Sequence, residues 1–292
     1  MRVWLVGAEG MLGHALSSVL GDRAELRSTD VDVDITNYET VARFAAEVRP
    51  DWIFNAAAYT RVDQAEQEEA LALRVNGDGP GNLAAAALAV GAGLVHVSTD
   101  YVFDGTATAP YEVDAPVAPR SAYGRSKLVG EQRVLEQIGQ GLRGYVVRTA
   151  WLFGEHGHNF VRTMVRLMVE RPELRVVADQ RGCPTYAADL ALATWQLVEH
   201  GAPPGIYHFS NSGPTTWHAF AERIREGMRE LGLPTATERV LPITTAEYPL
   251  PAPRPAYSVL STDRYQRVVG VQPRPWNDAL MEYLKNLKSE LS

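Results

Sequence analysis

Apolar runs rich in β-branched residues alternate with stretches of helical periodicity from Val3 to Ala178. Runs that are apolar at consecutive positions are typical of strands buried on both faces of a parallel sheet. The predicted strands are Val3–Gly7, Glu25–Asp30, Trp52–Ala56, Leu94–Ser98, Tyr145–Thr149 and Arg175–Ala178. The predicted helices between them are Met11–Leu20, Tyr38–Val48, Asn82–Val90 and Ala122–Gln137. This alternation predicts an α/β fold with a Rossmann-type doubly wound parallel sheet.

The pattern loosens beyond Ala150, where a proline-rich stretch, Pro249–Pro255, interrupts the predicted elements. These later elements are a helix at Ala187–His200, a strand at Gly205–Ser210, and helices at Trp217–Leu231 and Trp276–Leu287. No flexible linker separates the two regions. We therefore expect one domain over residues 1–150 and a smaller α/β part over residues 151–292, interleaved with the first and divided from it by a soft boundary.

Composition and charge narrow the classes of function. The chain is 46% hydrophobic, enough for a large core, and its formal net charge of −7 argues against binding to nucleic acid or to an anionic membrane. Its single cysteine, Cys183, excludes an intrachain disulfide, and its seven histidines show no metal-ligand spacing. The start is not a signal peptide, and no apolar run approaches a membrane-spanning length. We expect a cytoplasmic protein without a bound metal.

The first predicted strand runs into a glycine-rich turn that holds Gly7, Gly10 and Gly13 and opens the first predicted helix. Glycines at such points allow a tight turn, a close approach of the backbone to a diphosphate, and close packing of helix on strand. The helix N-terminus adds unpaired N–H groups and the positive end of a dipole. The spacing is GxxGxxG rather than GxGxxG, yet the strand–turn–helix context favours a dinucleotide site over a plain connecting turn. Residues 1–150 are therefore expected to bind NAD(P), and residues 151–292 the substrate.

Acidic residues follow the glycine turn. Asp30, at the end of the second predicted strand, is placed to bind the hydroxyls of the adenosine ribose, which favours NADH, while nearby Arg27 leaves NADPH open. Asp34 and Ile35 are placed to flank the adenine, and Asp34 has the alternative role of capping the helix that starts near Tyr38.

The third predicted strand ends in Ala56, Ala57 and Ala58. Small side chains at the carboxyl end of a central strand let a cofactor approach the backbone. Alanines are also ordinary packing residues, so only their place at the strand end favours a binding role.

A tyrosine and a lysine stand four residues apart at Tyr123 and Lys127, which places both on one face of the predicted helix. We expect the ammonium group to lower the pKa of the phenol, so that the phenol can donate a proton to a carbonyl oxygen while hydride reaches the carbon. Thr99, at the end of the fourth predicted strand, is expected to bond the same oxygen. A surface Tyr–Lys pair is the plainer alternative, but the glycine turn upstream and Thr99 favour catalysis.

Ordered motifs extend along nearly the whole chain, and with them it resembles the extended short-chain dehydrogenase/reductase superfamily and, within it, the dTDP-4-dehydrorhamnose reductases. The motifs are NAAAYTRVDQAE (Asn55–Glu66), STDYVFDG (Ser98–Gly105), YGRSKLVGE (Tyr123–Glu131), VRTAWLFG (Val147–Gly154), DQRGCPT (Asp179–Thr185), TTW (Thr215–Trp217) and RPAYSVL (Arg254–Leu260). The resemblance implies reduction, by NADPH or NADH, of the 4-keto group of dTDP-4-dehydro-L-rhamnose to give dTDP-L-rhamnose, the last step of dTDP-rhamnose biosynthesis.

The resemblance also implies roles for individual residues. The implied catalytic residues are Thr99, Tyr123 and Lys127. The implied substrate-binding residues are Thr99, Asp100, Tyr123, Trp151, Asn159 and Arg254. The cofactor-binding residues are expected to be Gly7, Gly10, Met11, Leu12, Gly13, Asp30, Asp34, Ile35, Ala56, Ala57, Ala58, Tyr59, Tyr123 and Lys127. Three of the substrate positions have a plainer alternative: Trp151 in the core, Asn159 as a helix cap, and Arg254 as a surface charge.

At a few positions the sequence differs from the motifs of related enzymes, and these differences limit which properties the resemblance implies. Sugar-nucleotide dehydratases place an acidic residue directly after the aspartate at the strand end, whereas Tyr101 stands there in this chain, which favours simple reduction. Some of these reductases resemble magnesium-bridged dimers that use acidic residues where this chain has His14, Ala15 and Ala188. We therefore expect no metal, and a monomer or a homodimer.

Two other functions stay open. One is reduction of another nucleotide-linked 4-keto-deoxysugar by the same chemistry. The other is a noncatalytic regulatory subunit, since the accessory subunit of methionine adenosyltransferase resembles these reductases.

Overall fold

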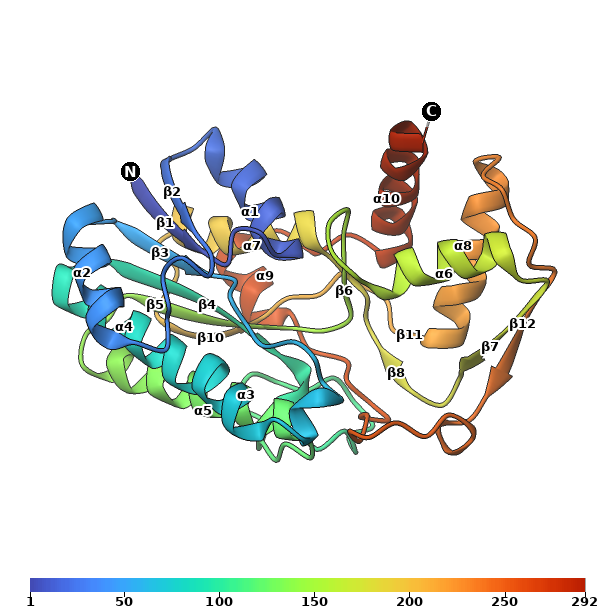
Figure 1. Ribbon diagram of the computed structural model, residues 1–292, viewed down its shortest axis with the longest axis horizontal. Helices are drawn as coiled ribbons and strands as arrows, with labels where there is room; N and C mark the ends of the chain where they lie inside the picture. The colour runs from blue at the N-terminus through green and yellow to red at the C-terminus, as the bar shows by residue number, and fades with distance from the viewer. Residues whose placement is uncertain (292) are drawn as a thin grey trace.

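A six-stranded sheet forms the centre of the computed structural model, which describes residues 1–291 (Figure 1). Its strands are β1 (Arg2–Val6), β2 (Glu25–Thr29), β3 (Trp52–Asn55), β4 (Gly93–Thr99), β5 (Gly144–Thr149) and β10 (Gly205–His208). The order is β2-β1-β3-β4-β5-β10, and all neighbouring strands run parallel. The order reverses between β1 and β3, and such a switch point is where ligands bind in doubly wound sheets.

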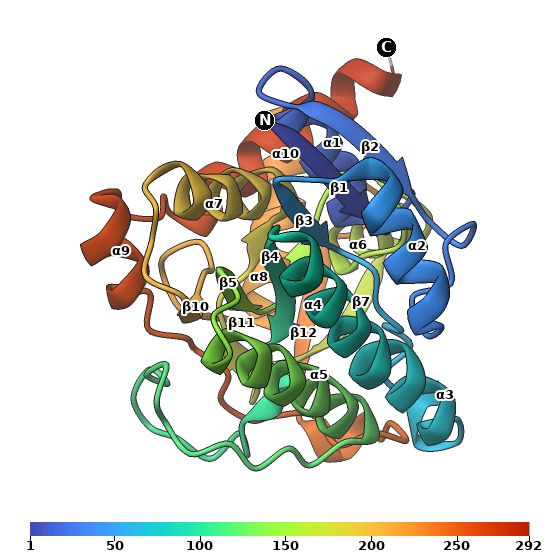
Figure 2. The ribbon, with the colours of Figure 1, turned by 90° about the vertical axis from the view of Figure 1, so that its left-hand side faces the viewer.

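Helices cover both faces of this sheet, as Figure 2 shows. One face packs against α1 (Met11–Gly21), α7 (Ala187–Glu199) and α9 (Asp263–Val269), and the other against α2 (Tyr38–Val48), α4 (Gly79–Val90) and α5 (Ala122–Gly139). Strand β1 explains the arrangement: Val3 and Leu5 enter one core, and Trp4 and Val6 enter the other. The prediction of an α/β Rossmann-type sheet with strands buried on both faces is confirmed.

A smaller α/β part lies beside one end of this sheet and has its own apolar core (Figure 1). It contains three helices, α6 (Phe160–Glu170), α8 (Trp217–Glu230) and α10 (Trp276–Leu291). Its strands form three pairs: β7 (Glu173–Val177) with β12 (Arg239–Ile243), β6 (Leu152–Phe153) with β9 (Thr185–Tyr186), and β8 (Arg181–Gly182) with β11 (Thr215–Thr216). The remaining short helical segments are Gln64–Glu66, α3 (Glu69–Leu73), a π-helical turn at Arg74–Asp78, Asp100–Val102 and Thr245–Glu247.

Two strands take partners that their local sequence did not indicate. The strand predicted at Arg175–Ala178 is present as β7, but it pairs with β12 and lies outside the main sheet, so its predicted place there is wrong. The strand predicted at Gly205–Ser210 is β10 and completes the main sheet beside β5. Strand pairing joins residues far apart in the chain, so an apolar run predicts a strand without predicting its partner.

Within residues 1–291, no helix combines the length and the apolar character needed to cross a membrane.

A buried ion pair joins helix α5 to the sheet. Arg148 on β5 donates from Nε to Oε1 of Glu131 at 2.9 Å and from a terminal nitrogen to Oε2 at 2.7 Å. The two side chains are 3% and 1% exposed. Another Arg148 nitrogen bonds the carbonyl of Val113 at 3.3 Å, and the guanidinium lies 5.0 Å from the ring centre of Phe103. Because neither charge reaches water, each depends on the other.

We expect Arg148→Met to lower the free energy of unfolding by about 3–5 kcal/mol, because it leaves Glu131 charged and unpaired in the interior. Adding Glu131→Gln to Arg148→Met should recover part of this loss. Urea unfolding measures both variants. Arg239→Met is the matched control, since its pair with Glu173 is 71% and 37% exposed and should contribute under about 1 kcal/mol. Equal losses in the single and double variants would show that the unpaired charge is not the cause.

Candidate active site

The three glycines of the turn after β1 serve different needs. Gly7 has a φ of +79°, and a Cβ there would lie 2.5 Å from the backbone nitrogen of Ala57. A Cβ on Gly13 would lie 2.1 Å from the carbonyl oxygen of Gly7. Gly10 is exposed, and its Cβ would meet only that oxygen, at 3.4 Å. The protein's own packing therefore requires glycine at the first and third positions, while the second leaves open space above the backbone.

That open space lies at the N-terminus of α1. Gly10 is the N-cap residue and supplies no capping side chain, and the first turn carries no acidic residue. The N–H groups of Met11, Leu12 and Gly13 are therefore available to an anion, and the helix dipole favours one there. The turn fits the diphosphate of a dinucleotide.

Asp30 lies beside this turn, at the end of β2. Its Oδ2 accepts a hydrogen bond from the backbone N–H of Glu9 at 2.9 Å, which fixes the carboxylate next to the glycines. Arg27 instead pairs with Glu25 at 3.0 Å on the exposed edge strand. The position of Asp30 fits hydrogen bonds to ribose hydroxyls.

Asp34 and Ile35 lie in the loop that follows. Asp34 accepts bonds from the N–H and the hydroxyl of Thr36, at 2.9 and 2.8 Å. Helix α2 is capped by Asn37, which accepts from the N–H of Thr40 at 3.2 Å. The alternative that Asp34 caps this helix is therefore wrong. Ile35 is buried in the core that covers one face of the sheet.

Two buried asparagines hold the strand-end backbone after β3. Asn55 accepts from the N–H of Ala57 at 3.1 Å and donates to His96 at 3.0 Å. Asn76 accepts from the N–H of Tyr59 at 2.8 Å and donates to the carbonyl of Tyr59 at 3.0 Å. Ala56, Ala57, Ala58 and Tyr59 are each half-buried, on the other side of the switch point from the glycines. Sequence reasoning missed Asn76, because its π-helical turn has no local signature.

Thr99, Tyr123 and Lys127 lie together at the carboxyl end of β4. Helix α5 starts where Ser121 accepts a hydrogen bond from the N–H of Gly124 at 3.0 Å, and this cap places Tyr123 in the first turn. The Tyr123 phenol lies close enough to the Thr99 side chain for that side chain to influence its pKa. The Lys127 ammonium is buried and donates to the carbonyl of Val97 on β4 at 2.7 Å. The structure thus brings together the three residues predicted to be catalytic.

Burial sets the proton affinities of this group. It raises the pKa of Tyr123, the nearby Thr99 hydroxyl opposes this rise, and the Asp100 carboxylate adds to it. Burial also lowers the pKa of Lys127 to about 8, against the opposite influence of Glu131. The expectation that Lys127 lowers the pKa of Tyr123 does not hold here, because loss of solvent around the phenol dominates and Lys127 is not among the groups that shift it.

Asp100 is a buried carboxylate beside Thr99. Its Oδ1 accepts from the Thr99 hydroxyl at 2.9 Å, and burial raises its pKa to about 6. The nearby Ser258 hydroxyl counters this rise. Among the described residues, neither Oδ2 of Asp100 nor the hydroxyl of Ser258 has a hydrogen-bond partner of normal geometry. A buried polar atom without a partner calls for an explanation, and a ligand that bonds it is one.

Trp151 and Asn159 follow β5. Trp151 is half-buried and has a φ of +49°, a left-handed conformation that is strained for a bulky residue. It therefore differs from an ordinary core tryptophan. Asn159 caps α6: its Oδ1 accepts from the N–H of Arg162 at 3.0 Å, and its Nδ2 donates to the carbonyl of Gly154 at 2.8 Å. The plainer role of Asn159 is thus present, and its contact with substrate stays a prediction.

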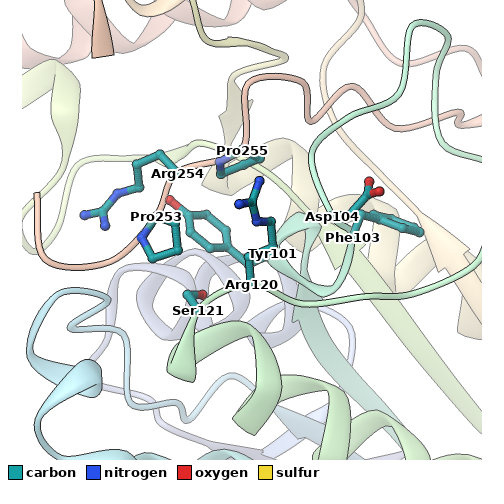
Figure 3. Close-up of a pocket in the computed structure, with 8 residues that line it drawn as sticks. All are labelled: Tyr101, Phe103, Asp104, Arg120, Ser121, Pro253, Arg254 and Pro255. Carbon is teal, nitrogen blue, oxygen red and sulfur yellow. The ribbon is translucent and has the colours of Figure 1, made fainter. Parts of the chain in front are cut away.

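Arg254 is not a free surface charge. Its two terminal nitrogens bond the two carboxylate oxygens of Asp63, at 2.8 and 2.7 Å, and one of them also bonds the carbonyl of Ala252. Arg254 lines a small pocket in which the hydroxyl of Tyr101 points toward the segment that carries Pro253 and Arg254 (Figure 3). Asp63 belongs to a motif quoted above, but its partner lies 191 residues away, beyond the reach of any local pattern.

No three His, Cys, Asp or Glu side chains gather as a metal-binding group among the side chains of residues 1–289. At the positions discussed for a metal-bridged dimer, His14 stacks on His156 with ring centres 3.9 Å apart.

Comparison with known proteins gives an independent result. The sequence pattern of the family described as RmlD substrate binding domain matches residues 1–289. The dTDP-4-dehydrorhamnose reductase of Burkholderia thailandensis is 42% identical over 99% of this chain and 100% of its own length. The dTDP-4-keto-6-deoxy-D-glucose reductase of Streptomyces niveus is 43% identical over 99% of each chain. A crystal structure of dTDP-4-dehydrorhamnose reductase from Bacillus anthracis in complex with NADP has a TM-score of 0.90 and 40% identity, covering 98% of this chain and 99% of that one.

We expect the buried Asp100 to make stability fall as pH rises through about 6. The folded chain binds this proton more tightly than the unfolded chain, so the group favours folding at low pH and loses that contribution above its folded pKa. Between about pH 5 and about pH 8, the wild type should lose ~1–2 kcal/mol more than Asp100→Asn in urea unfolding.

Asp104→Asn is the matched control for this measurement. Hydrogen bonds from Thr106 and Tyr111 lower the pKa of Asp104 to about 2, so it does not titrate across that interval. Its variant should follow the pH dependence of the wild type. A parallel dependence in the wild type and Asp100→Asn would contradict a raised pKa.

Proposed function

Because the chain belongs to the RmlD substrate binding domain family, we propose that it reduces the 4-keto group of dTDP-4-dehydro-L-rhamnose to give dTDP-L-rhamnose, with NADPH or NADH as the reductant. One observation carries the proposal: Thr99, Tyr123 and Lys127 meet at the carboxyl end of β4, in the same sheet whose switch point carries the glycine turn. Relatives with high identity over the full chain are named as reductases of dTDP-linked 4-keto sugars.

The cofactor, when bound, supplies a hydride to the carbonyl carbon. The backbone of Gly10 and the N–H groups that open α1 hold its diphosphate, and Asp30 holds the adenosine ribose. The backbone from Ala56 to Tyr59, which Asn55 and Asn76 hold by hydrogen bonds, lies on the other side of the cofactor site from the glycine turn.

Tyr123 donates the proton to the carbonyl oxygen. Its raised pKa keeps the phenol protonated at neutral pH, as a donor must be. As hydride bonds to the carbon, the π electron pair of the carbonyl moves to the oxygen, which becomes basic enough to take the proton. Thr99 lies beside the phenol and is proposed to hydrogen-bond the same carbonyl oxygen. Lys127 adds a buried positive charge near the developing negative charge.

Tyr101 follows Asp100, so this strand end holds one carboxylate and a phenol rather than two acids. Burial raises the pKa of Tyr101, so the phenol stays protonated and cannot act as a base at neutral pH. This pairing supports reduction without loss of water.

Asp100, Trp151, Asn159 and Arg254 are proposed to bind the sugar nucleotide. Asp100 offers an unpaired carboxylate oxygen to a sugar hydroxyl, and Trp151 offers an indole face. Asp63 occupies the two terminal nitrogens of Arg254, so the Nε side of the guanidinium is the part left for a diphosphate.

A second candidate is reduction of another dTDP-linked 4-keto-deoxysugar, and the name of the Streptomyces niveus relative favours keeping it. The noncatalytic regulatory role would leave the gathered Thr99, Tyr123 and Lys127 without use. A cytoplasmic monomer or homodimer that binds neither nucleic acid nor membrane remains our expectation.

Incubating the purified protein with dTDP-4-dehydro-L-rhamnose and following NADPH or NADH absorbance tests the proposal directly. We expect oxidation of the nicotinamide and formation of dTDP-L-rhamnose. Oxidation only with dTDP-4-keto-6-deoxy-D-glucose or a similar sugar would favour the second candidate. No oxidation with any keto-sugar nucleotide would favour the regulatory role.

We expect Tyr123→Phe to lower kcat by about 10²- to 10⁴-fold, because it removes the proton donor and leaves the ring in place. Binding of NADPH, measured by fluorescence titration, should stay near the wild-type value. Tyr145→Phe is the matched control, since that buried phenol bonds the carbonyl of Ala202 and lies outside the site. Near-normal turnover by Tyr123→Phe would show that the assignment is wrong.

We expect Asp30→Ser to raise the ratio of kcat/KM with NADPH to kcat/KM with NADH by about tenfold, because it removes a carboxylate that repels a 2′-phosphate. Steady-state kinetics with each cofactor measure the ratio. Asp22→Ser, at the exposed end of α1, should leave it unchanged. An unchanged ratio in Asp30→Ser would mean that this carboxylate does not meet the ribose.

A further inference from the structure

Three motifs of the C-terminal half each contribute a residue that the mechanism above does not use, and these residues lie around Trp151 and its neighbour Gly182. The motif at Asp179–Thr185 contributes Gly182, the motif at Thr215–Trp217 contributes Trp217, and the motif at Arg254–Leu260 contributes Ser258. These segments come from three separate places in the chain and meet around one side chain that follows β5.

Trp217 covers one face of the Trp151 indole. The ring centres are 3.6 Å apart and the planes are inclined by 11°, so the two indoles stack nearly parallel. Trp217 itself is held firmly: it starts helix α8, whose N-cap Thr216 accepts from the N–H of Ala219 at 3.1 Å, and its ring lies 4.6 Å from that of Phe160. It is therefore a fixed surface for the Trp151 ring.

Gly182 leaves room for the same indole. A Cβ at this position would lie 2.6 Å from Cε2 of Trp151 and 2.7 Å from the hydroxyl oxygen of Ser258. The backbone of Gly182 does not have a positive φ, so no turn requires a glycine here. The requirement is space for Trp151 and Ser258, and Ser258 in turn lies beside Asp100.

The backbone of Trp151 needs such support. A bulky residue in the left-handed conformation persists only where its surroundings hold it, and such strain is concentrated at functional sites. The carbonyl of Trp151 accepts from the N–H of Thr185 at 3.1 Å, which fixes the main chain. The Trp217 stack and the gap at Gly182 then fix the side chain.

We propose that Trp217 is a positioning residue for the reduction: it holds the Trp151 indole by its covered face, so that the opposite face meets the sugar nucleotide, and Gly182 supplies the space this placement needs. Trp217 acts through Trp151 and has no contact with substrate of its own. The inference rests on the proposed function, because that function supplies the substrate.

The test is a double-mutant cycle on KM for dTDP-4-dehydro-L-rhamnose. Trp217→Phe should raise this KM by about 3- to 10-fold, because a smaller ring gives up part of the stack, while kcat and the KM for NADPH stay near the wild-type values. In a Trp151→Phe background, Trp217→Phe should have little further effect, since its role is exercised through that indole.

Trp276→Phe is the matched control. This tryptophan starts α10 and packs 5.3 Å from the ring of Phe220, in the same core as Trp217, without stacking on Trp151. Its variant should keep the wild-type KM. Near-UV circular dichroism adds a readout that does not need turnover: the changes caused by Trp151→Phe and Trp217→Phe should not add in the double variant, whereas those of Trp151→Phe and Trp276→Phe should.

An unchanged KM in Trp217→Phe would overturn the proposal, as would effects of Trp151→Phe and Trp217→Phe that add in full. If Trp217→Phe fails to fold, Gly182→Ala replaces it, and its added methyl group should raise the same KM by displacing the indole. A wild type that turns over no keto-sugar would refute the proposed function instead, and the dichroism cycle would still decide whether the two indoles are coupled.

Discussion

The buried ion pair between Glu131 and Arg148 is the constraint on which the site depends. It ties the helix that carries Tyr123 and Lys127 to the strand whose end leads into Trp151. Neither charge is in contact with water. Moving the helix along the strand would therefore leave an unpaired charge in the interior, which solvates it poorly. The same helix is held at its start, where the N–H of Ala122 donates to Glu66 at 2.8 Å. Distances between groups on β4, β5 and α5 are therefore fixed by the scaffold before any ligand arrives.

Local features of this protein followed from its sequence because their causes are local. The glycine turn, the doubly buried strands and the pairing of Tyr123 with Lys127 each depend on residues a few positions apart. The partner strands of β7 and β10 could not be predicted, because an apolar run indicates a strand but not the strand it pairs with. The ion pair between Asp63 and Arg254 could not be predicted either, because it joins two segments that lie 191 residues apart in the sequence. The direction of the pKa shift of Tyr123 was misjudged because it depends on how much solvent the fold removes, which spacing on a helix does not reveal.

Unfavourable features are gathered at the end of β4 and β5. Asp100 is a carboxylate with an unpaired buried oxygen, Lys127 is a buried ammonium with a lowered pKa, and Trp151 has a strained backbone. Elsewhere in the sheet, mostly apolar side chains fill both faces, and buried polar groups such as Arg148 and Asn55 have hydrogen-bond partners. Local instability of this kind is what a preorganised site requires, since groups that are fully satisfied by the protein have nothing to offer a ligand.

The place of β10 at the edge of the main sheet also bears on how the chain can be divided. The strand lies beyond the first helix and the first strands of the smaller part, yet it covers the outer edge of β5. A chain ending near residue 150 would expose six residues of apolar strand, β5, with unpaired backbone groups along one side. Such an edge invites association with other chains. Residues 1–150 are therefore not an independent module, and during synthesis the edge of β5 remains open until the chain has been made as far as β10.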